Sequence, residues 1–204
     1  MSTSEPSVKG TLVQPWRDHL LELVTAGRMT RAALEARLDE AARKLLDARF
    51  ISSAWYPYDA YAQLVEACCA FEHGGARQGY RALGHLGMEQ LESVGVYQQL
   101  QSWARGAGLP DREIASRLET LLSLPSLLYN FSKWSLDLEI ENGQYRHSLE
   151  VREAGPMRDW FREILEGTLD SLWERLRIPL AECKGDRPTR DRFVVHAVAV
   201  RPRR

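Results

Sequence analysis

The clearest pattern in the sequence is a strict alternation of apolar and polar residues from residue 136 to residue 141. A period of two is typical of a β-strand with one buried face. The apolar positions are Leu136, Leu138 and Ile140, with acidic residues between them. Asn142-Gly143 follows, and this pair favours the type I′ turn of a β-hairpin because both residues tolerate positive φ. A two-residue turn fixes the register, so Leu138 is predicted to lie opposite His147.

Three further segments complete a sheet-forming half of the chain. From Pro156 to Leu176, apolar residues recur at helical spacing and predict a long helix. "RIPLAEC" (177–183) is typical of a third strand, "KGDRPTRD" (184–191) of a charged turn, and "RFVVHAVAV" (192–200) of a last, β-branched strand. The order strand, strand, helix, strand, strand predicts an antiparallel sheet with the helix on one face.

The first half of the chain has helical periodicity instead. "PWRDHLLELVTAG" predicts a helix that Gly27 ends, after a short strand or extended lead-in at 8–13. Thr30 is suited to cap one following helix, whose apolar stripe is Leu34, Leu38, Ala41 and Leu45. On its other face Asp39–Arg43 and Glu40–Lys44 are expected to pair. "VYQQLQSWA" (96–104) continues the pattern, and Pro110 and Pro125 each open a later helix.

A glycine-rich helix is predicted around "YRALGHLGMEQL". Gly79, Gly84 and Gly87 each cost a helix about 1 kcal/mol relative to alanine. Such a cost predicts that a neighbouring backbone packs closely against this helix. A phosphate-binding glycine loop is excluded because no strand leads into the segment and no lysine followed by Ser or Thr closes it.

These elements predict an α+β fold, a helical N-terminal half packed with a four-stranded antiparallel sheet. We expect a disordered tail at 1–7 and a single domain at 8–204. Within it, 8–134 is mainly helical, and 135–200 forms a hairpin, a helix and a second hairpin. No internal repeat interrupts this organisation.

Residues 51–71 gather five aromatic residues: Trp55, Tyr56, Tyr58, Tyr61 and Phe71. Pro57 keeps Tyr56 extended and suits the start of a helix. The stretch therefore predicts an extended segment that turns into an amphipathic helix. Aromatic residues at helical spacing are usually core. A binding box that is core and pocket wall at once stays open as the alternative.

Composition narrows the class of protein. The chain has 204 residues, of which 44% are hydrophobic, and a net charge of −1, which argues against a nucleic-acid-binding surface. No segment approaches the roughly 20 apolar residues of a membrane span, and the N-terminus lacks the apolar stretch of a signal peptide. The three cysteines show no disulfide framework, so we expect a cytoplasmic protein.

Candidate chemistry centres on His147, which lies on the apolar face of the hairpin and faces the long helix. A neutral imidazole there can ligate a metal or a haem iron, act as a base, or be a core histidine with a hydrogen-bond partner. His85, among the glycines of its helix, can also meet a ligand, although a helix-surface position is more common, and His196 is expected in the core or at an edge. The chain has no G-x-S-x-G, H-E-x-x-H or C-x-x-C motif. We therefore expect no enzyme activity.

The order of these segments resembles a known group. "SSAWYPYDAYAQLVEA", "YRALGHLGMEQL", "SLPSLLYNFSKW", "LDLEIENGQYRHSLEV" and "IPLAECKGDRPTRDRFVVHAVAV" together resemble myxobacterial paralogous proteins distantly related to haem-nitric-oxide-binding and 4-vinyl-reductase-type sensor domains. The resemblance covers nearly the whole chain from Val8. It implies a small-molecule or interaction module, often dimeric, with the ligand between helices and sheet.

Two departures from that group concern cofactors. Arg192 precedes Phe193 where metal-binding relatives carry a second cysteine, so a zinc site at Cys183 lacks a soft ligand. The haem relatives carry a Tyr-x-Ser-x-Arg clamp, but "YNFSKW" has the wrong spacing and no arginine. We therefore expect no cofactor and no metal.

Two functions remain open. One is a non-catalytic regulatory or sensory domain that binds a hydrophobic small molecule between helices and sheet. The other is a protein-interaction adaptor with a solidly packed core and no ligand. We expect a homodimer or a protein partner in either case. The candidate ligand-binding residues are His147, Tyr61, Trp55, Tyr129 and Trp134.

Overall fold

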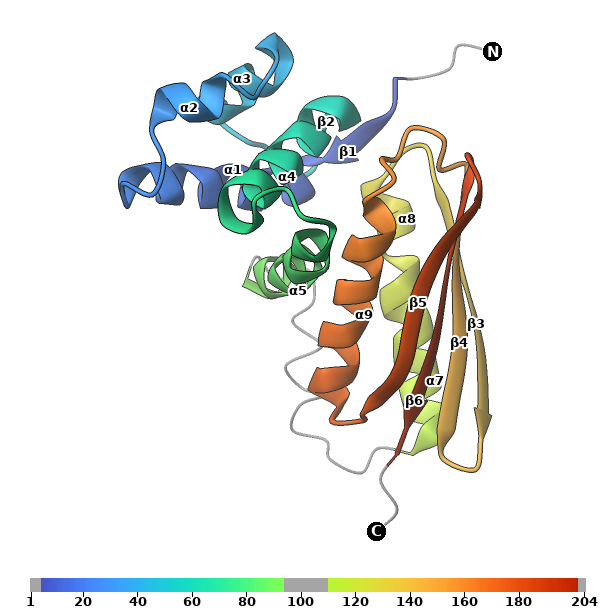
Figure 1. Ribbon diagram of the computed structural model, residues 1–204. Coiled ribbons are helices and arrows are strands. Elements are labelled where there is room, and N and C mark those ends of the chain that lie inside the picture. Colours follow the sequence, from blue (N-terminus) through green and yellow to red (C-terminus); the bar gives the residue numbers. More distant parts are fainter. Residues whose placement is uncertain (1–4, 94–109, 202–204) are drawn as a thin grey trace. The chain divides into compact units, whose positions relative to one another are not determined.

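The computed structural model describes residues 5–93 and 110–201, shown in Figure 1. The chain forms two compact units. The first unit is Met1–Gly79 with Leu128–Phe131, and the second unit is Tyr80–Leu127 with Ser132–Arg204. The predicted helical segment 96–104 lies outside the described residues. The chain is described from Glu5, and Ser7 already belongs to a strand.

The first unit is mainly helical. Its strands β1 (Ser7–Lys9) and β2 (Trp55–Pro57) pair antiparallel, with Val8 opposite Tyr56. Its helices are α1 (Gly10–Thr25), α2 (Arg31–Glu35), α3 (Glu40–Asp47) and α4 (Tyr58–His73). The expected strand at 8–13 is therefore shorter than predicted, because α1 begins at Gly10. A Cβ at Gly10 would lie 2.4 Å from the Ile51 carbonyl oxygen, so only glycine fits there.

The prediction for residues 51–71 is confirmed. Trp55–Pro57 is extended, Pro57 occupies the N-cap position, and α4 runs from Tyr58 until Gly74 ends it in the left-handed region (φ 62°). The side chains of Tyr61, Val65 and Cys68 are buried, as their helical spacing predicts.

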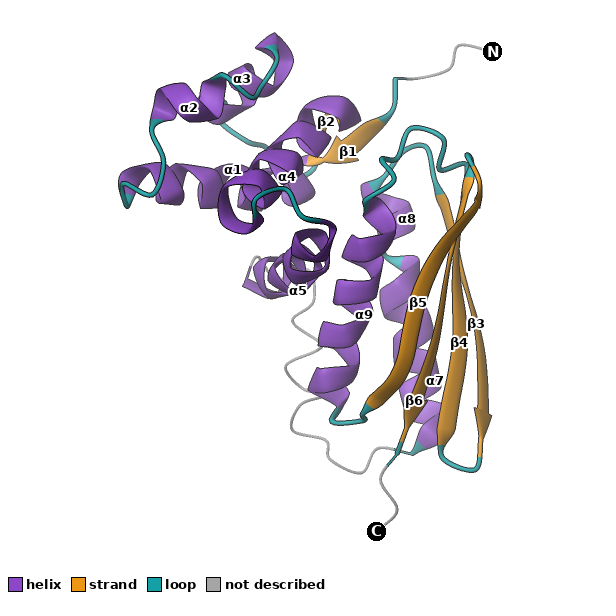
Figure 2. Cartoon of the chain, in the orientation of Figure 1, coloured by secondary structure: helices purple, strands orange, loops and turns teal. Residues whose placement is uncertain are grey.

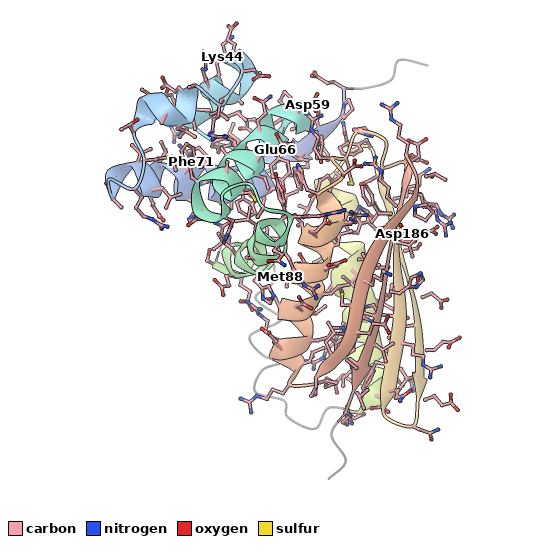
Figure 3. The ribbon with its side chains drawn as sticks, in the orientation of Figure 1. Lys44, Asp59, Glu66, Phe71, Met88 and Asp186 are labelled. Atoms are coloured by element: carbon pink, nitrogen blue, oxygen red, sulfur yellow. The ribbon has the colours of Figure 1, made fainter. Side chains whose placement is uncertain are left out.

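The prediction of one helix after Thr30 was wrong. Thr30 caps α2 by accepting a hydrogen bond from the Ala33 N–H (3.1 Å). Asp39 then accepts one from the Ala42 N–H (2.8 Å) and starts α3 as a second helix. This phase buries Ala42 in place of Ala41. The Glu40–Lys44 ion pair forms at 2.7 Å, and Lys44 points into solvent (Figure 3).

The second unit contains the four-stranded antiparallel sheet, in the order β3-β4-β6-β5 (Figure 2). Its strands are β3 (Lys133–Glu141), β4 (Gln144–Arg152), β5 (Leu180–Thr189) and β6 (Arg192–Val200). Its helices are α5 (Arg77–Ser93, whose first residues belong to the first unit), α7 (Asp111–Ser123), α8 (Pro125–Leu128) and α9 (Phe161–Leu176). The α+β fold is thus as predicted.

The hairpin has the predicted turn and register. Asn142 and Gly143 both have positive φ (50° and 76°), and Leu138 lies opposite His147. Tyr145, His147, Leu149 and Val151 are buried along one face of β4, whereas residues between them are more exposed. We call this buried face the inner face of the sheet.

Two boundaries in the second unit differ from the prediction. Residues 184–189 belong to β5, so only Arg190 and Asp191 form the turn. The strand tolerates Pro188 because β5 is an edge strand and its pairing with β6 shifts register between Asp186 and Thr189. In addition, α9 begins at Phe161 and not at Pro156, with Trp160 at its N-cap position.

The predicted close packing of the glycine-rich helix is confirmed. A Cβ at Gly84 of α5 would lie 2.3 Å from the Ile164 carbonyl oxygen of α9. A Cβ at Gly167 of α9 would lie 1.9 Å from the Arg81 carbonyl oxygen of α5. The two helix backbones therefore touch where each presents a glycine. Arg81 reinforces the contact through hydrogen bonds to both carboxylate oxygens of Asp170 (2.6 and 2.9 Å).

We expect Gly84→Ala to lower the free energy of unfolding by about 1–3 kcal/mol, because the added methyl group meets backbone that cannot rotate away. This loss outweighs the helix-propensity gain of about 1 kcal/mol. Urea denaturation measures the change, with the exposed α5 substitution Glu89→Ala as control. A Gly84→Ala protein more stable than the wild type would show that the two backbones do not touch.

Candidate functional site

His147 lies on the inner face of the sheet, between Leu138 of β3 and Ala197 of β6. Its side chain is only 5% exposed. On α9 its ring contacts Trp173, with ring centroids 5.5 Å apart. The hairpin register places His147 correctly, and the helix residue that covers it was missed.

The polar atoms of this ring pair have no protein partner. Both ring nitrogens of His147 and the indole Nε1 of Trp173 are buried and make no hydrogen bond. Leaving a buried polar group unpaired costs about 1–3 kcal/mol. Three such atoms in one ring–ring contact are unusual, since buried polar groups are nearly always paired.

Burial also fixes the charge of His147. Desolvation, with a smaller contribution from repulsion by His196, lowers its pKa from 6.5 to about 4. His196 itself is exposed on the opposite face of β6, which corrects its expected place in the core or at an edge. His147 is therefore neutral at physiological pH, with one ring nitrogen as a donor and the other as an acceptor.

Tyr145 connects the His147–Trp173 ring pair to an ion pair nearer the surface. Its hydroxyl donates to the Asp111 Oδ1 of α7 (2.6 Å), and Arg201 pairs with the same carboxylate (3.1 Å). The Tyr145 ring contacts Trp173 at 5.3 Å. Because Tyr145 contacts both α7 and α9, the two helices cover the same face of the sheet (Figure 1). Trp173 is thus held between Tyr145 and His147.

The other residues proposed from sequence lie elsewhere. Trp134, on β3, donates to Ser132 Oγ (2.9 Å) and packs edge-on against Phe161. It pairs with Val151, which is four residues, or about 13 Å, along β4 from His147. Trp134 and His147 therefore share a face of the sheet but do not converge on one point.

Tyr61, Tyr129 and Trp55 belong to the first unit. Tyr61 is buried, and hydrogen bonds from Tyr129 and Trp16 oppose the effect of burial, which raises its pKa to about 12. Trp55 is 45% exposed on β2, where the Lys9 ammonium lies 3.9 Å from its ring centroid. The structure therefore brings Tyr61 and Tyr129 together in a core cluster and leaves Trp55 at the surface.

The second unit also has a pocket of about 550 Å³, which the sequence did not predict beyond His85 as a residue that could meet a ligand. It is lined by His85, Asp170, Glu174, Arg177, Ile178, Pro179 and Leu180. His85 Nε2 lies 3.6 Å from Asp170 and its Nδ1 lies 3.9 Å from Glu174. The spacing of the charged residues was one available signal. On α5, Arg81 and His85 are four residues apart and so lie on one face of the helix. The same spacing puts Glu166, Asp170 and Glu174 on one face of α9.

We found no family model that matches the sequence and no curated protein that matches it. Solved structures do match. An oxygen-binding H-NOX domain related to soluble guanylate cyclases, in its oxygen complex, gives a TM-score of 0.59 at 12% identity over 94% of both chains. The fold is that of the H-NOX domains.

Two further H-NOX structures agree. A mutant of the T. tengcongensis domain gives a TM-score of 0.58 at 12% identity, covering 95% of this chain and 98% of its own. An unliganded Fe(II) H-NOX mutant from K. algicida gives 0.55 at 11% identity, covering 95% and 97%. The resemblance to haem-nitric-oxide-binding sensor domains is therefore confirmed at the level of the fold.

The H-NOX fold implies haem, so the five histidines must be tested as iron ligands. All five are among the described residues. His19 is hydrogen-bonded to Glu72 (2.7 Å), and His73 is exposed at the end of α4. His85 sits between two carboxylates, and His196 is exposed on the outer face. Only His147 has unbonded, buried nitrogens, and Trp173 packs against its ring.

Other features also disagree with haem. Burial raises the pKa of Cys183 to about 12 and that of Cys68 well above its ordinary value, so neither is a thiolate at neutral pH. The glycine contact leaves no space for a porphyrin between α5 and α9. We conclude that the residues which the structure describes do not fit haem. Nor do the described residues contain a group of three or more His, Cys, Asp or Glu side chains suited to a metal ion.

We expect His147 to make stability depend on pH. Its folded pKa (about 4) lies below its unfolded pKa (6.5), so between these values the unfolded chain binds more protons. The stability that neutral His147 contributes is therefore fully present above pH 6.5. It is lost as the pH falls, by about 3 kcal/mol at pH 4. His147→Leu should remove this part of the loss. Urea denaturation of both proteins at pH 7.5 and pH 4 measures it.

His196→Leu is the matched control, because His196 lies opposite the neighbouring residue Ser148 but is exposed. This variant should lose nearly as much stability as the wild type, since burial is the larger cause of the His147 shift. Equal losses in the His147→Leu and wild-type proteins would contradict the burial of an unpaired imidazole.

Proposed function

We propose that this chain is a non-catalytic regulatory or sensory domain that binds a small molecule between the sheet and the helices of its second unit. The observation that carries the proposal is the buried, unpaired His147 beside the unpaired Trp173. A core with no role in binding gains stability by replacing such a pair with apolar residues. Polar atoms kept in this state are accounted for by a ligand that pairs with them.

The fold supports the same class of function. One of the similar structures is an oxygen-binding domain related to soluble guanylate cyclases. That protein binds its ligand within this architecture, and the present chain uses the same architecture with a different set of side chains. We therefore assign the sensory class and do not carry over the gas or the haem.

The chemistry of the described residues supports a non-catalytic role. His147 has no carboxylate to orient it, and its pKa of about 4 makes it a weak base at neutral pH. The high pKa of Cys183 keeps that thiol protonated. No described helix is long and apolar enough to cross a membrane.

A protein-interaction adaptor is the second candidate. The inner face favours it, because Tyr145, Leu149, Trp173 and Phe193 are almost completely buried and the 550 Å³ pocket is not lined by His147. The exposed Ile51 and Trp55 on the first unit offer apolar contact area for a partner or a second copy. If the protein is an adaptor, the unpaired nitrogen atoms lower its stability and bind no ligand.

Native mass spectrometry of the protein purified from its own host separates the two candidates. The sensory reading predicts one retained small molecule per chain, which dissociates on denaturation. We expect His147→Leu to remain folded, with a thermal midpoint at or above that of the wild type, and to lose the retained mass. Thermal melting of the same samples establishes that the variant is folded.

His196→Leu is the control, and it should keep both the fold and the ligand. The same spectra give the number of chains in the assembly and so also test the expected homodimer. A ligand-free wild-type protein, or a ligand retained by folded His147→Leu, would favour the adaptor.

A further inference from the structure

We infer that His147 and Trp173 form a binding site for one small, uncharged molecule that carries a hydroxyl group. This inference rests on the proposed function, because it names the class of ligand that the same site takes. It is carried by three buried nitrogen atoms and by the absence of any charged partner for them among the described residues.

The available hydrogen-bonding groups select the chemistry of the ligand. The indole Nε1 of Trp173 can only donate, whereas neutral His147 offers one donor and one acceptor on opposite sides of its ring. A hydroxyl group donates once and accepts twice, so it can pair with the acceptor nitrogen of His147 and with the indole N–H. The rings are in contact, with centroids 5.5 Å apart, so one group beside them can serve both.

The remaining N–H of His147 points away from that hydroxyl and calls for a second acceptor. The ligand therefore carries a second oxygen or brings a water molecule with it. A purely apolar molecule leaves all three nitrogens unpaired, and the cost of burying them remains.

Charge is excluded by the surroundings of the site. The residues opposite His147 in the sheet are Leu138 and Ala197, and Leu149 and Leu172 are buried on the elements that carry the two rings. Asp111 and Arg201, the ion pair that Tyr145 contacts, are already bonded to each other and to the Tyr145 hydroxyl. A buried carboxylate or ammonium group would find no counter-ion at His147, and that is costly.

Phenol, toluene and benzoate are suitable probes, because they share one ring and differ only in polarity and charge. The readout is the indole N–H cross-peak of Trp173 in a proton–nitrogen spectrum, assigned by its loss in Trp173→Phe. We expect phenol to shift this peak in a saturable manner. Toluene and benzoate should bind at least about tenfold more weakly, since toluene lacks the hydroxyl and benzoate carries a charge that finds no counter-ion.

Two substitutions locate the effect. His147→Leu should weaken phenol binding about tenfold by removing one hydrogen-bond partner, and His196→Leu should leave it unchanged. The inference is overturned if toluene or benzoate shifts the peak as strongly as phenol does. It is also overturned if phenol causes no saturable shift.

The outcome is separable from that of the proposed function. Phenol binding that depends on His147 supports the ligand class even if the protein from its host retains no molecule, in which case only the sensory role fails. A retained host ligand that is charged, or that lacks a hydroxyl group, overturns the ligand class while the sensory role stands.

Discussion

The packing of α9 on the inner face of the sheet determines the rest of the second unit. The helix presents Leu165, Leu169, Leu172 and Trp173 as buried side chains, and the sheet presents the alternate residues of β4 and β6. On the side of α5, Gly84 and Gly167 let the two helix backbones touch, and Arg81 binds Asp170 and Glu166. These contacts hold α9 in register, and this register brings Trp173 against His147.

The same packing explains how an H-NOX fold can exist here without the features that haem needs. A fold is specified by the pattern of buried positions, and a cofactor site is specified by a few side chains placed on it. In this chain the helix–helix contact is backbone to backbone, and the four histidines other than His147 are exposed or lie beside a carboxylate. The architecture is retained while the site chemistry differs, as expected at 11–14% identity.

Local sequence patterns predicted the parts of the fold that local physics decides. The alternation at 136–141 and the Asn142-Gly143 turn fix the hairpin, because a period of two and a two-residue turn leave one register. The helix after Thr30 was predicted as one because the apolar stripe continues, whereas the Asp39 side chain caps a second start. The strand at 184–189 was missed because its charged residues are typical of a turn, and its pairing with β6 is a tertiary effect.

The candidate site was only partly predictable, because its surroundings also depend on tertiary packing. His147 stood out because one polar residue interrupts an apolar face. Trp173 did not, since an aromatic residue on a long amphipathic helix is typical of core. That neither ring has a partner depends on which side chains surround them, which no spacing rule shows. Trp55, Tyr61 and Tyr129 were predicted to belong to one site, and the structure separates exposed Trp55 from the buried pair.

The protein itself leaves a neutral imidazole, that of His147, buried and unpaired beside Trp173. Nitrogen-15 NMR of the histidine rings as a function of pH tests it most directly in ligand-free protein, because the ring shifts report both protonation and hydrogen bonding. We expect His147 to stay neutral until the pH falls to about 4, because burial lowers its pKa from 6.5 to about 4. A His147 that titrates near pH 6.5, or whose two nitrogens are both hydrogen-bonded to protein groups, would contradict it.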